Sequence, residues 1–250
     1  MRRTPRIYIP GNSLRQSERF LLDSNIRHRL ANVLRLKKSD ELILFNGIDP
    51  VEASVKIVHL DRKTAEVEID KIEKVSRESP LQTCLWQAIE KQDRMDYAIQ
   101  KAVELGVSCI QPVYTEYSLP PFRQDRLKKK IAHWQGIIIH ACEQTGRCIL
   151  PALKDPLALS ALLQKRDRKI TGLMPDPDAV KSLRECHIDT GKKIEILIGP
   201  IAGFTKDEVL DAEKKGMQSL RLGPRILRTE TAGITMLAWL QIEYGDLRMV

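Results

Sequence analysis

No apolar run in this chain of 250 residues approaches the roughly 20 residues that a membrane-spanning helix needs. The basic start Met1-Arg2-Arg3 is followed by no apolar segment of the kind that a secretory signal carries. Internal repeats and low-complexity tracts are also missing. We therefore expect a soluble, cytoplasmic protein, and its 42% of hydrophobic residues can bury a sizeable core in one large domain or two smaller ones.

Cysteine is scarce, and its spacing argues against a metal site. The five cysteines are an odd number and form no Cys-x-x-Cys pair. A set built from His140, Cys142 and Cys148 fits no standard zinc spacing. Cys84 and Cys109 lie in apolar runs, where a buried thiol behaves as a small hydrophobe. We expect no metal.

Positive charge is in excess. Lys and Arg number 41 against 33 Asp and Glu, which gives a net charge of +8 and a pI near 9.2. Such an excess favours an anionic partner, and nucleic acid is the commonest.

The chain also lacks a phosphate-binding loop, although it has two Gly-Pro turns. One lies within Leu197–Phe204 and the other within Leu220–Ala232, and each follows a short apolar run that predicts a buried strand. Neither ends in Lys-Ser/Thr or has the spacing of the dinucleotide fingerprint. Glycines at strand ends let a ligand approach bare backbone, and open α/β sheets bind ligands at the carboxyl ends of their strands. These turns predict a site for a ligand that is not held by a polyphosphate.

Two domains follow from the change of pattern along the chain. The first seventy residues predict strands over 41–45, 51–57 and 65–69 and a helical segment over 25–34, in a small barrel or sandwich. Residues 71–80 are polar, end in Ser-Pro, and are expected to form a linker.

From Leu81 onward, strands alternate with helices, which indicates a parallel sheet flanked by helices. We expect strands over 83–89, 107–113, 170–174, 194–198 and 219–222, and helices over 95–106, 126–141, 206–215 and 231–244. The last helix is apolar on nearly every side, so it must be buried in the domain or against a second copy of the protein. We favour a dimer.

Several motifs resemble one family over nearly the whole chain, in order. The strongest is the string Leu222-Gly-Pro-Arg-Ile-Leu-Arg-Thr-Glu-Thr-Ala232; the others are Gln100–Val107, Ala141–Arg147, Leu197–Pro200, Tyr244–Leu247, and Pro5–Tyr8 with His28 and Val33–Arg35. The chain resembles the RsmE family of bacterial methyltransferases, which modify N3 of a uridine in small-subunit (16S) ribosomal RNA. One loop departs from the family pattern, because Gly199-Pro-Ile-Ala-Gly203 stands where Gly-Pro-Glu-Gly-Gly is usual. The lost glutamate either positioned substrate or cofactor, or was structural and is replaced by an isoleucine that fills an apolar gap.

The resemblance implies a SPOUT-type α/β domain with a trefoil knot over residues 75–250 and a PUA-like RNA-binding β-barrel over residues 1–74. It also implies a homodimer, S-adenosylmethionine as cofactor, and 16S ribosomal RNA or the small ribosomal subunit as partner. A ribose 2′-O-methyltransferase of the same superfamily acting on transfer RNA, or an RNA-binding assembly protein without catalysis, are the alternatives.

S-adenosylmethionine carries no phosphate, and its adenine is best held by backbone groups between apolar side chains in a concave pocket. The residues expected to bind it are Met174, Pro175, Leu197, Ile198, Gly199, Pro200, Gly203, Leu222, Gly223, Ile226, Leu227, Arg228, Thr229, Thr231 and Ala232. Glu230 is the candidate base for the uracil N3 proton, with a helix N-terminal carboxylate as the alternative. Arg228 is the candidate to stabilise charge on the uracil oxygens.

Basic residues of the first domain are expected to contact RNA phosphates, which position RNA without reading its sequence. The candidates for RNA binding are Arg2, Arg3, Arg6, Arg27, His28, Arg29 and Arg35, together with Arg147 of the second domain. Glu143 and Arg147 either face the RNA, pair across a dimer interface, or form local salt bridges.

Overall fold

The computed structural model describes residues 4–11, 14–15, 17–75 and 77–248. The chain folds into two compact units, each described by itself below. The first contains residues 1–78 together with 142–150, and the second contains residues 79–141 and 151–250.

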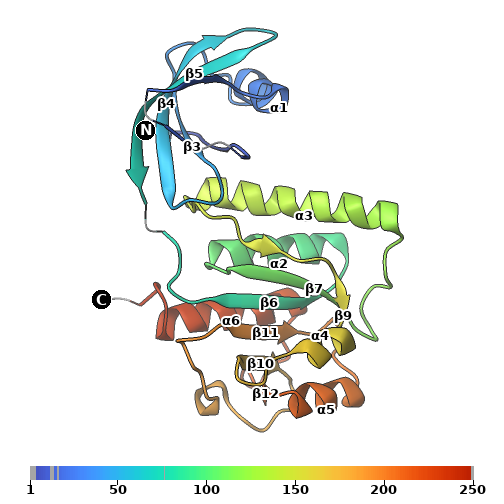
Figure 1. Ribbon diagram of the computed structural model, residues 1–250. Coiled ribbons are helices and arrows are strands. Elements are labelled where there is room, and N and C mark those ends of the chain that lie inside the picture. Colours follow the sequence, from blue (N-terminus) through green and yellow to red (C-terminus); the bar gives the residue numbers. More distant parts are fainter. Residues whose placement is uncertain (1–3, 12–13, 16, 76, 249–250) are drawn as a thin grey trace. The chain divides into compact units, whose positions relative to one another are not determined.

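A five-stranded sheet forms the first unit (Figure 1). Its strand order is β1-β3-β4-β5-β2; β1 runs parallel to β3 and the other pairs are antiparallel. The bounds are Arg6–Tyr8 (β1), Arg19–Leu21 (β2), Glu41–Phe45 (β3), Val51–Leu60 (β4) and Ala65–Lys74 (β5). A short helix α1 (Ser24–His28) continues into the π-helical turn η1 (Arg29–Val33), in the region where the sequence predicts a helix.

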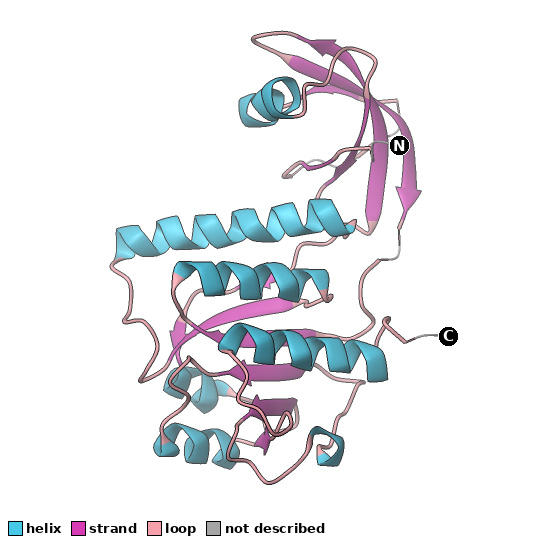
Figure 2. Ribbon diagram, turned by 180° about the vertical axis from the view of Figure 1, so that it is seen from behind, coloured by secondary structure: helices cyan, strands magenta, loops and turns pink. Residues whose placement is uncertain are grey.

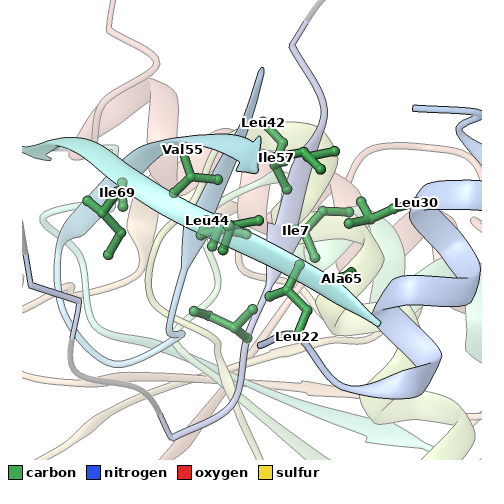
Figure 3. Close-up of a cluster of buried hydrophobic side chains, with 12 residues drawn as sticks. Ile7, Leu22, Leu30, Leu42, Leu44, Val55, Ile57, Ala65 and Ile69 are labelled. Atoms are coloured by element: carbon green, nitrogen blue, oxygen red, sulfur yellow. The ribbon is translucent and has the colours of Figure 1, made fainter. Parts of the chain in front are cut away.

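Alternate residues of the long strands build the core of this unit (Figure 3). Leu42 and Leu44 of β3 point to the same side as Val55 and Ile57 of β4, as the two-residue period of a strand requires. Leu30, from η1, is fully buried in the same cluster. The alternating pattern in the sequence therefore marked the buried face correctly.

The predicted linker at 71–80 is wrong in its first part. β5 continues to Lys74, and its last residues pair with the start of β4, where Val51 lies opposite Lys74 and Glu52 opposite Glu73. Charged residues surround the single apolar residue Ile72 in this strand end, so the alternating pattern of 65–69 does not continue there.

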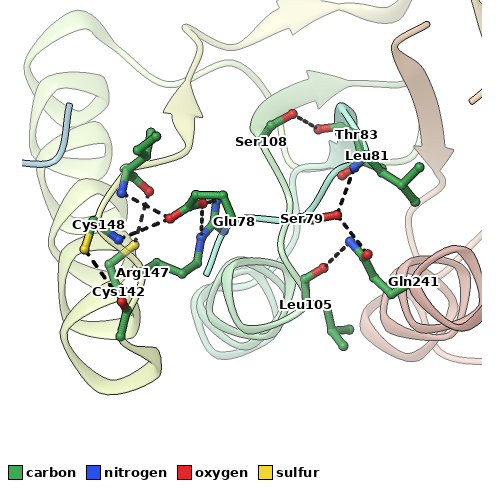
Figure 4. A network of polar contacts seen from close by, with 12 residues as sticks. Glu78, Ser79, Leu81, Thr83, Leu105, Ser108, Cys142, Arg147, Cys148 and Gln241 are labelled. Atoms are coloured by element: carbon green, nitrogen blue, oxygen red, sulfur yellow. Dashed lines mark hydrogen bonds and ion pairs between the residues drawn. The ribbon is translucent and has the colours of Figure 1, made fainter. Parts of the chain in front are cut away.

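Residues 142–150 join the first unit through the carboxylate of Glu78 (Figure 4). That side chain accepts hydrogen bonds from Arg147 Nε at 2.9 Å and from the backbone N–H groups of Cys148 and Ile149 at 3.1 and 3.2 Å. The predicted division at 74/75 therefore differs from the observed one at 78/79, and it leaves out this later segment.

The second unit is built on a seven-stranded parallel sheet. Its order is β12-β10-β11-β6-β7-β8, with β9 also paired to β7. The strands are β6 (Thr83–Ala88), β7 (Cys109–Tyr114), β8 (Ala152–Leu153), β9 (Leu157–Ala158), β10 (Thr171–Pro175), β11 (Ile194–Ile198) and β12 (Met217–Leu220). The expected parallel α/β sheet is confirmed; the trefoil knot stays a prediction.

Helices α2 (Gln92–Glu104), α4 (Leu159–Lys165), α5 (Lys206–Lys214) and α6 (Thr229–Glu243) belong to this unit, as do the 3₁₀ turn η2 (Leu183–Glu185) and most of α3 (Gln124–Thr145). Figure 2 shows α2 and α6 side by side, and they contact each other directly. α6 is also anchored by Gln241, whose side chain accepts from the Ser79 hydroxyl at 2.8 Å and donates to the Leu105 carbonyl at 3.0 Å (Figure 4).

The two faces of the sheet are covered by different helices. Cys84 and Trp86 of β6 lie in one cluster with Leu159 of α4 and Ala212 of α5. The alternate residue Leu85 faces Gly233 of α6 on the opposite side. Both faces of β6 are thus buried, which explains its nearly continuous apolar sequence.

Candidate cofactor site

A cavity of about 820 Å³ opens where three neighbouring strands end. β10 ends at Pro175, β11 at Ile198 and β12 at Leu220, and the segments that follow these strands supply most of the lining. The predicted residues found there are Pro175, Ile198, Gly199, Pro200, Gly203, Leu222, Gly223, Ile226, Leu227, Arg228, Thr229 and Ala232. The two Gly-Pro turns, about twenty residues apart in sequence, therefore face one space, as parallel strands with a common edge require.

The first loop, residues 199–204, folds back on itself. Gly203 adopts φ +77°, a conformation that favours glycine, and its N–H donates to the Pro200 carbonyl at 2.9 Å. The Phe204 ring lies directly against Gly199, where a Cβ would stand 2.9 Å from the nearest ring carbon. Glycine at 199 is therefore required by close packing.

The second loop, residues 221–228, connects β12 to α6. Gly223 has φ +95°, and its carbonyl accepts from Arg221 Nε at 3.1 Å. The loop ends at Arg228, the N-cap of α6. The next residue, Thr229, is 6% exposed and donates its hydroxyl to the Gly199 carbonyl at 2.6 Å, so the two loops are directly linked.

Three of the residues predicted to bind the cofactor do not line the cavity. Met174 and Leu197 are fully buried in the cluster beneath α4 and α5, because alternate residues of a strand point to opposite faces and their neighbours Pro175 and Ile198 face the cavity. Thr231 is exposed and also lies outside the lining.

Thr229 lines the cavity, but its hydroxyl is already engaged. The oxygen accepts from Gln87 Nε2 at 2.8 Å while its hydrogen goes to Gly199. The hydroxyl therefore links the two loops, and a contact between Thr229 and the cofactor stays a prediction.

Several lining residues were missed from the sequence. Asp176, Pro177 and Asp178 follow β10 directly, and the position of this segment after a predicted strand was the available signal. The other missed residues are Arg94, Ile201, Ala202, Phe204, Lys206, Val209, Leu210, Arg221 and Arg225. Arg94 comes from α2, so no local pattern connects it with either loop.

The two proposed catalytic residues differ in placement. Arg228 lines the cavity and is exposed. Glu230 is outside the lining and half-buried in the first turn of α6. Its Oε2 is buried and has no hydrogen-bond partner among the described residues. A helix N-terminal carboxylate is thus its observed position, and its role as base stays a proposal.

Two of the residues predicted to bind RNA are structural. Arg6 is 7% exposed; it pairs with Glu52 and donates to the Gly146 carbonyl at 3.0 Å. Arg147 is 5% exposed and pairs with Glu78 at 2.7 Å. Both predictions are wrong for one reason, since the acidic partners are far away in the sequence.

The remaining RNA candidates lie on the first unit. His28 and Arg35 are exposed, and Arg27 is half-buried. Arg29 is also half-buried, and its guanidinium pairs with Glu143. Arg2 and Arg3 lie outside the described residues.

Glu143 also has partners within the first unit. Its carboxylate accepts from both terminal nitrogens of Arg29 at 2.8 and 2.6 Å, and from the backbone N–H of Tyr8 at 3.1 Å. Glu143 and Arg147 thus each form a salt bridge within the chain, with Arg29 and Glu78, rather than with each other. Contact with RNA or across a dimer interface stays a prediction.

The cavity fits the chemistry of S-adenosylmethionine. Its volume lies within the roughly 300–1,000 Å³ that is usual for small-molecule sites. Bare backbone at Gly199, Gly203 and Gly223 lies beside apolar side chains such as Leu222 and Ile226, the mixture that holds an adenine ring. Charged groups of both signs, including Asp176, suit an amino acid group that carries an amine and a carboxylate.

In the described part of the chain, no helix is long and apolar enough to cross a membrane. The same residues contain no group of three or more His, Cys, Asp or Glu side chains placed to hold a metal ion.

Comparison with known families agrees with this geometry. An RNA methyltransferase domain family matches residues 77–241, and an RNA methyltransferase PUA domain family matches residues 22–70. The fold and its cavity therefore define an RNA methyltransferase with a PUA domain.

Individual relatives narrow the class. The chain is 35% identical over 246 residues to ribosomal RNA small subunit methyltransferase E of Buchnera aphidicola subsp. Schizaphis graminum, with 98% of this chain and 99% of the relative covered. A methyltransferase E structure from Neisseria gonorrhoeae bound to S-adenosyl methionine matches with a TM-score of 0.90 at 36% identity, covering 98% of this chain and all of that one. A Legionella pneumophila methyltransferase in complex with the same cofactor matches with a TM-score of 0.92 at 38% identity and the same coverage. The chain belongs to the ribosomal RNA small subunit methyltransferase E family.

Proposed function

We propose that this protein transfers the methyl group of S-adenosylmethionine to N3 of a uridine in small-subunit (16S) ribosomal RNA. The observation that carries the proposal is the cavity at the ends of β10, β11 and β12, which joins both glycine loops around space suited to the methyl donor. Family membership supports the class of reaction. Because ribosomal RNA is the substrate, we also expect a cytoplasmic enzyme.

The residues of the chain would assist in two ways. The bound donor supplies an electrophilic methyl group; the uracil N3–H bond breaks, an N3–methyl bond forms, and the donor leaves as S-adenosylhomocysteine. Glu230 would take the N3 proton, directly or through water. Arg228, on the cavity wall, would place its guanidinium donors against the uracil oxygens as they gain negative charge.

The direct test measures 3-methyluridine in ribosomal RNA by mass spectrometry. Cells that lack this protein should lose the modified nucleoside and regain it on complementation. Unmodified RNA in complemented cells, or modified RNA in the deletion strain, would refute the proposal.

Purified variants test the roles of the two residues. Arg228→Ala and Glu230→Gln should each lower turnover by about 10²-fold, typical of a lost proton-transfer or charge-stabilising group, with much smaller changes in cofactor affinity. Glu213→Gln, at an exposed position of α5 outside the cavity lining, is the control and should keep full turnover. Equal losses of turnover and cofactor affinity would contradict the roles assigned to Arg228 and Glu230.

We propose that the protein acts as a homodimer that buries α6. Beyond the cofactor site, this helix and the residues after it expose large apolar side chains, Ile242, Tyr244 and Leu247, at 52, 39 and 49%. Light scattering should give the mass of two 28.6 kDa chains for the native protein, and a lower mass for Ile242→Glu at the same concentration. A monomeric native protein would exclude this assembly.

A further inference from the structure

Gln87 is a polar side chain enclosed at the centre of the parallel sheet. It is the next-to-last residue of β6 and is 1% exposed. Its Nε2 donates to the Thr229 hydroxyl at 2.8 Å, and that hydroxyl donates to the Gly199 carbonyl at 2.6 Å. Gln87 does not itself line the cavity, yet both of its successive partners do.

We infer that Gln87 is a positioning residue for the cofactor site: it fixes the distance between the two glycine loops by orienting the Thr229 hydroxyl. The inference rests on the proposed function, because it assigns the loops to the methyl donor. A carboxamide nitrogen can only donate, so its hydrogen bond occupies a lone pair of the Thr229 oxygen. The hydroxyl hydrogen is then directed to the Gly199 carbonyl, and the bond links the start of α6 to the first loop.

The surroundings of Gln87 support a specific role for its side chain. A buried amide in an apolar strand destabilises the fold unless it is hydrogen-bonded. The Nε2 of Gln87 has its partner in Thr229, whereas its Oε1 is buried and has no hydrogen-bond partner among the described residues. α6 passes this oxygen at Gly233, where a Cβ would stand in ordinary contact with it at 3.6 Å. Glu90, two residues after β6, also contacts the first loop, because its Oε1 accepts from the Ile201 N–H at 2.9 Å. The first loop is therefore hydrogen-bonded twice to this region, through Thr229 and Gln87 and directly to Glu90.

The neighbouring strand offers a matched control. Gln111 of β7 is also buried, at 6% exposure, and lies opposite Trp86 in the register of β6 and β7. Its Nε2 donates to the carbonyls of Pro112 and Asp155 at 2.9 and 2.8 Å, and it does not line the cavity. Gln111→Leu removes the same amide from the same sheet without touching the cofactor site.

The experiment measures S-adenosylmethionine affinity by calorimetry and the melting temperature for each variant. Gln87→Leu and Gln111→Leu should both lower the melting temperature, but only Gln87→Leu should weaken binding, by tenfold or more. Thr229→Val should weaken it similarly, and Thr229→Ser, which keeps the hydroxyl, should bind like the native protein. The double variant Gln87→Leu/Thr229→Val should bind no more weakly than Thr229→Val, because Gln87 acts through the hydroxyl.

Two results would overturn the inference. One is native affinity in Gln87→Leu. The other is a double variant whose loss is the product of the two single losses. If Gln87→Leu does not fold, the comparison of Thr229→Val with Thr229→Ser decides, and equal affinities would reject the role of the hydroxyl. Failure of the proposed function is distinct, because the native protein would then bind no S-adenosylmethionine or leave the RNA unmodified.

Discussion

A single methyl group added at Gly199 should disturb both the packing and the cofactor site. Its Cβ would stand 2.9, 3.1 and 3.2 Å from three carbons of the Phe204 ring, whereas ordinary contact begins at 3.4 Å. The ring would have to withdraw by about 0.5 Å. Phe204 packs against the cluster beneath α4 and α5 on one side and borders the cavity on the other, so the displaced ring would have to move toward the cavity. We expect Gly199→Ala to lower the free energy of unfolding by about 1–3 kcal/mol, the usual cost of overpacking.

The same displacement should weaken cofactor binding, because Phe204 also lines the cavity. We expect S-adenosylmethionine to bind about tenfold more weakly, equivalent to about 1.4 kcal/mol. Calorimetric titration gives the affinity, and urea unfolding gives the stability. The clash involves the Phe204 ring alone, so removing the ring should remove most of the effect. Adding Gly199→Ala to Phe204→Leu should therefore reduce cofactor affinity less than adding Gly199→Ala to the native protein.

Gly136 provides the control for the loss of a glycine. It lies within α3, and a Cβ there would meet no atom within 4 Å. Gly136→Ala should therefore stabilise the protein by about 0.5–1 kcal/mol, with native cofactor affinity. Native stability and affinity in Gly199→Ala would refute the close packing of the ring on the loop.

Three further predictions concern charged and titrating groups. Arg35→Ala should weaken binding to a 16S RNA fragment and reduce the slope of log affinity against log salt by about 0.7. Arg6→Met should leave that slope unchanged and lower the free energy of unfolding by about 3 kcal/mol. Equal slopes for both variants would contradict the assignment of Arg35 to RNA binding and of Arg6 to the fold. A hydrogen bond from Cys84 lowers the pKa of Cys109 to about 7, so alkylation of Cys109 followed by mass spectrometry should be half-maximal near pH 7, and a midpoint above pH 8 would contradict it. Arg166→Met removes a buried guanidinium from its carboxylate partner and two backbone carbonyls, and it should lower the free energy of unfolding in urea by about 3–5 kcal/mol; a loss under 1 kcal/mol would show that the pair is dispensable.

The features that the sequence predicted well are local ones. β11 was expected over 194–198 and is found there, because four of its five residues are apolar and the run is bounded by charged residues and Gly-Pro. The position of both glycine loops at strand ends followed from the Gly-Pro dipeptide that comes after each apolar run. Their meeting in one cavity followed from the parallel sheet, since its strands share one carboxyl edge.

The features that could not be predicted from the sequence depend on partners that are distant along the chain. β1 has three residues and pairs in parallel with β3, more than thirty residues later, so its own sequence carries no strand signal. The structural arginines were visible as basic residues, yet Glu52 and Glu78 are 46 and 69 positions away from Arg6 and Arg147. Polar residues at special positions can be recognised by type, but only the fold shows whether water, RNA or a carboxylate faces them.

The departure of the first loop from the family pattern changes its chemistry more than its shape. Ala202 lies outside the left-handed region and needs no glycine, while Gly203 keeps the one positive φ that this turn requires. Ile201 is anchored through its backbone N–H, a contact that any residue other than proline makes, and its side chain is 56% exposed. The hypothesis that the Ile201 side chain fills an apolar gap is therefore wrong. An acidic side chain at this position would meet solvent at the rim of the cavity, so its absence alters what approaches the cavity and leaves the backbone turn at Gly203 intact.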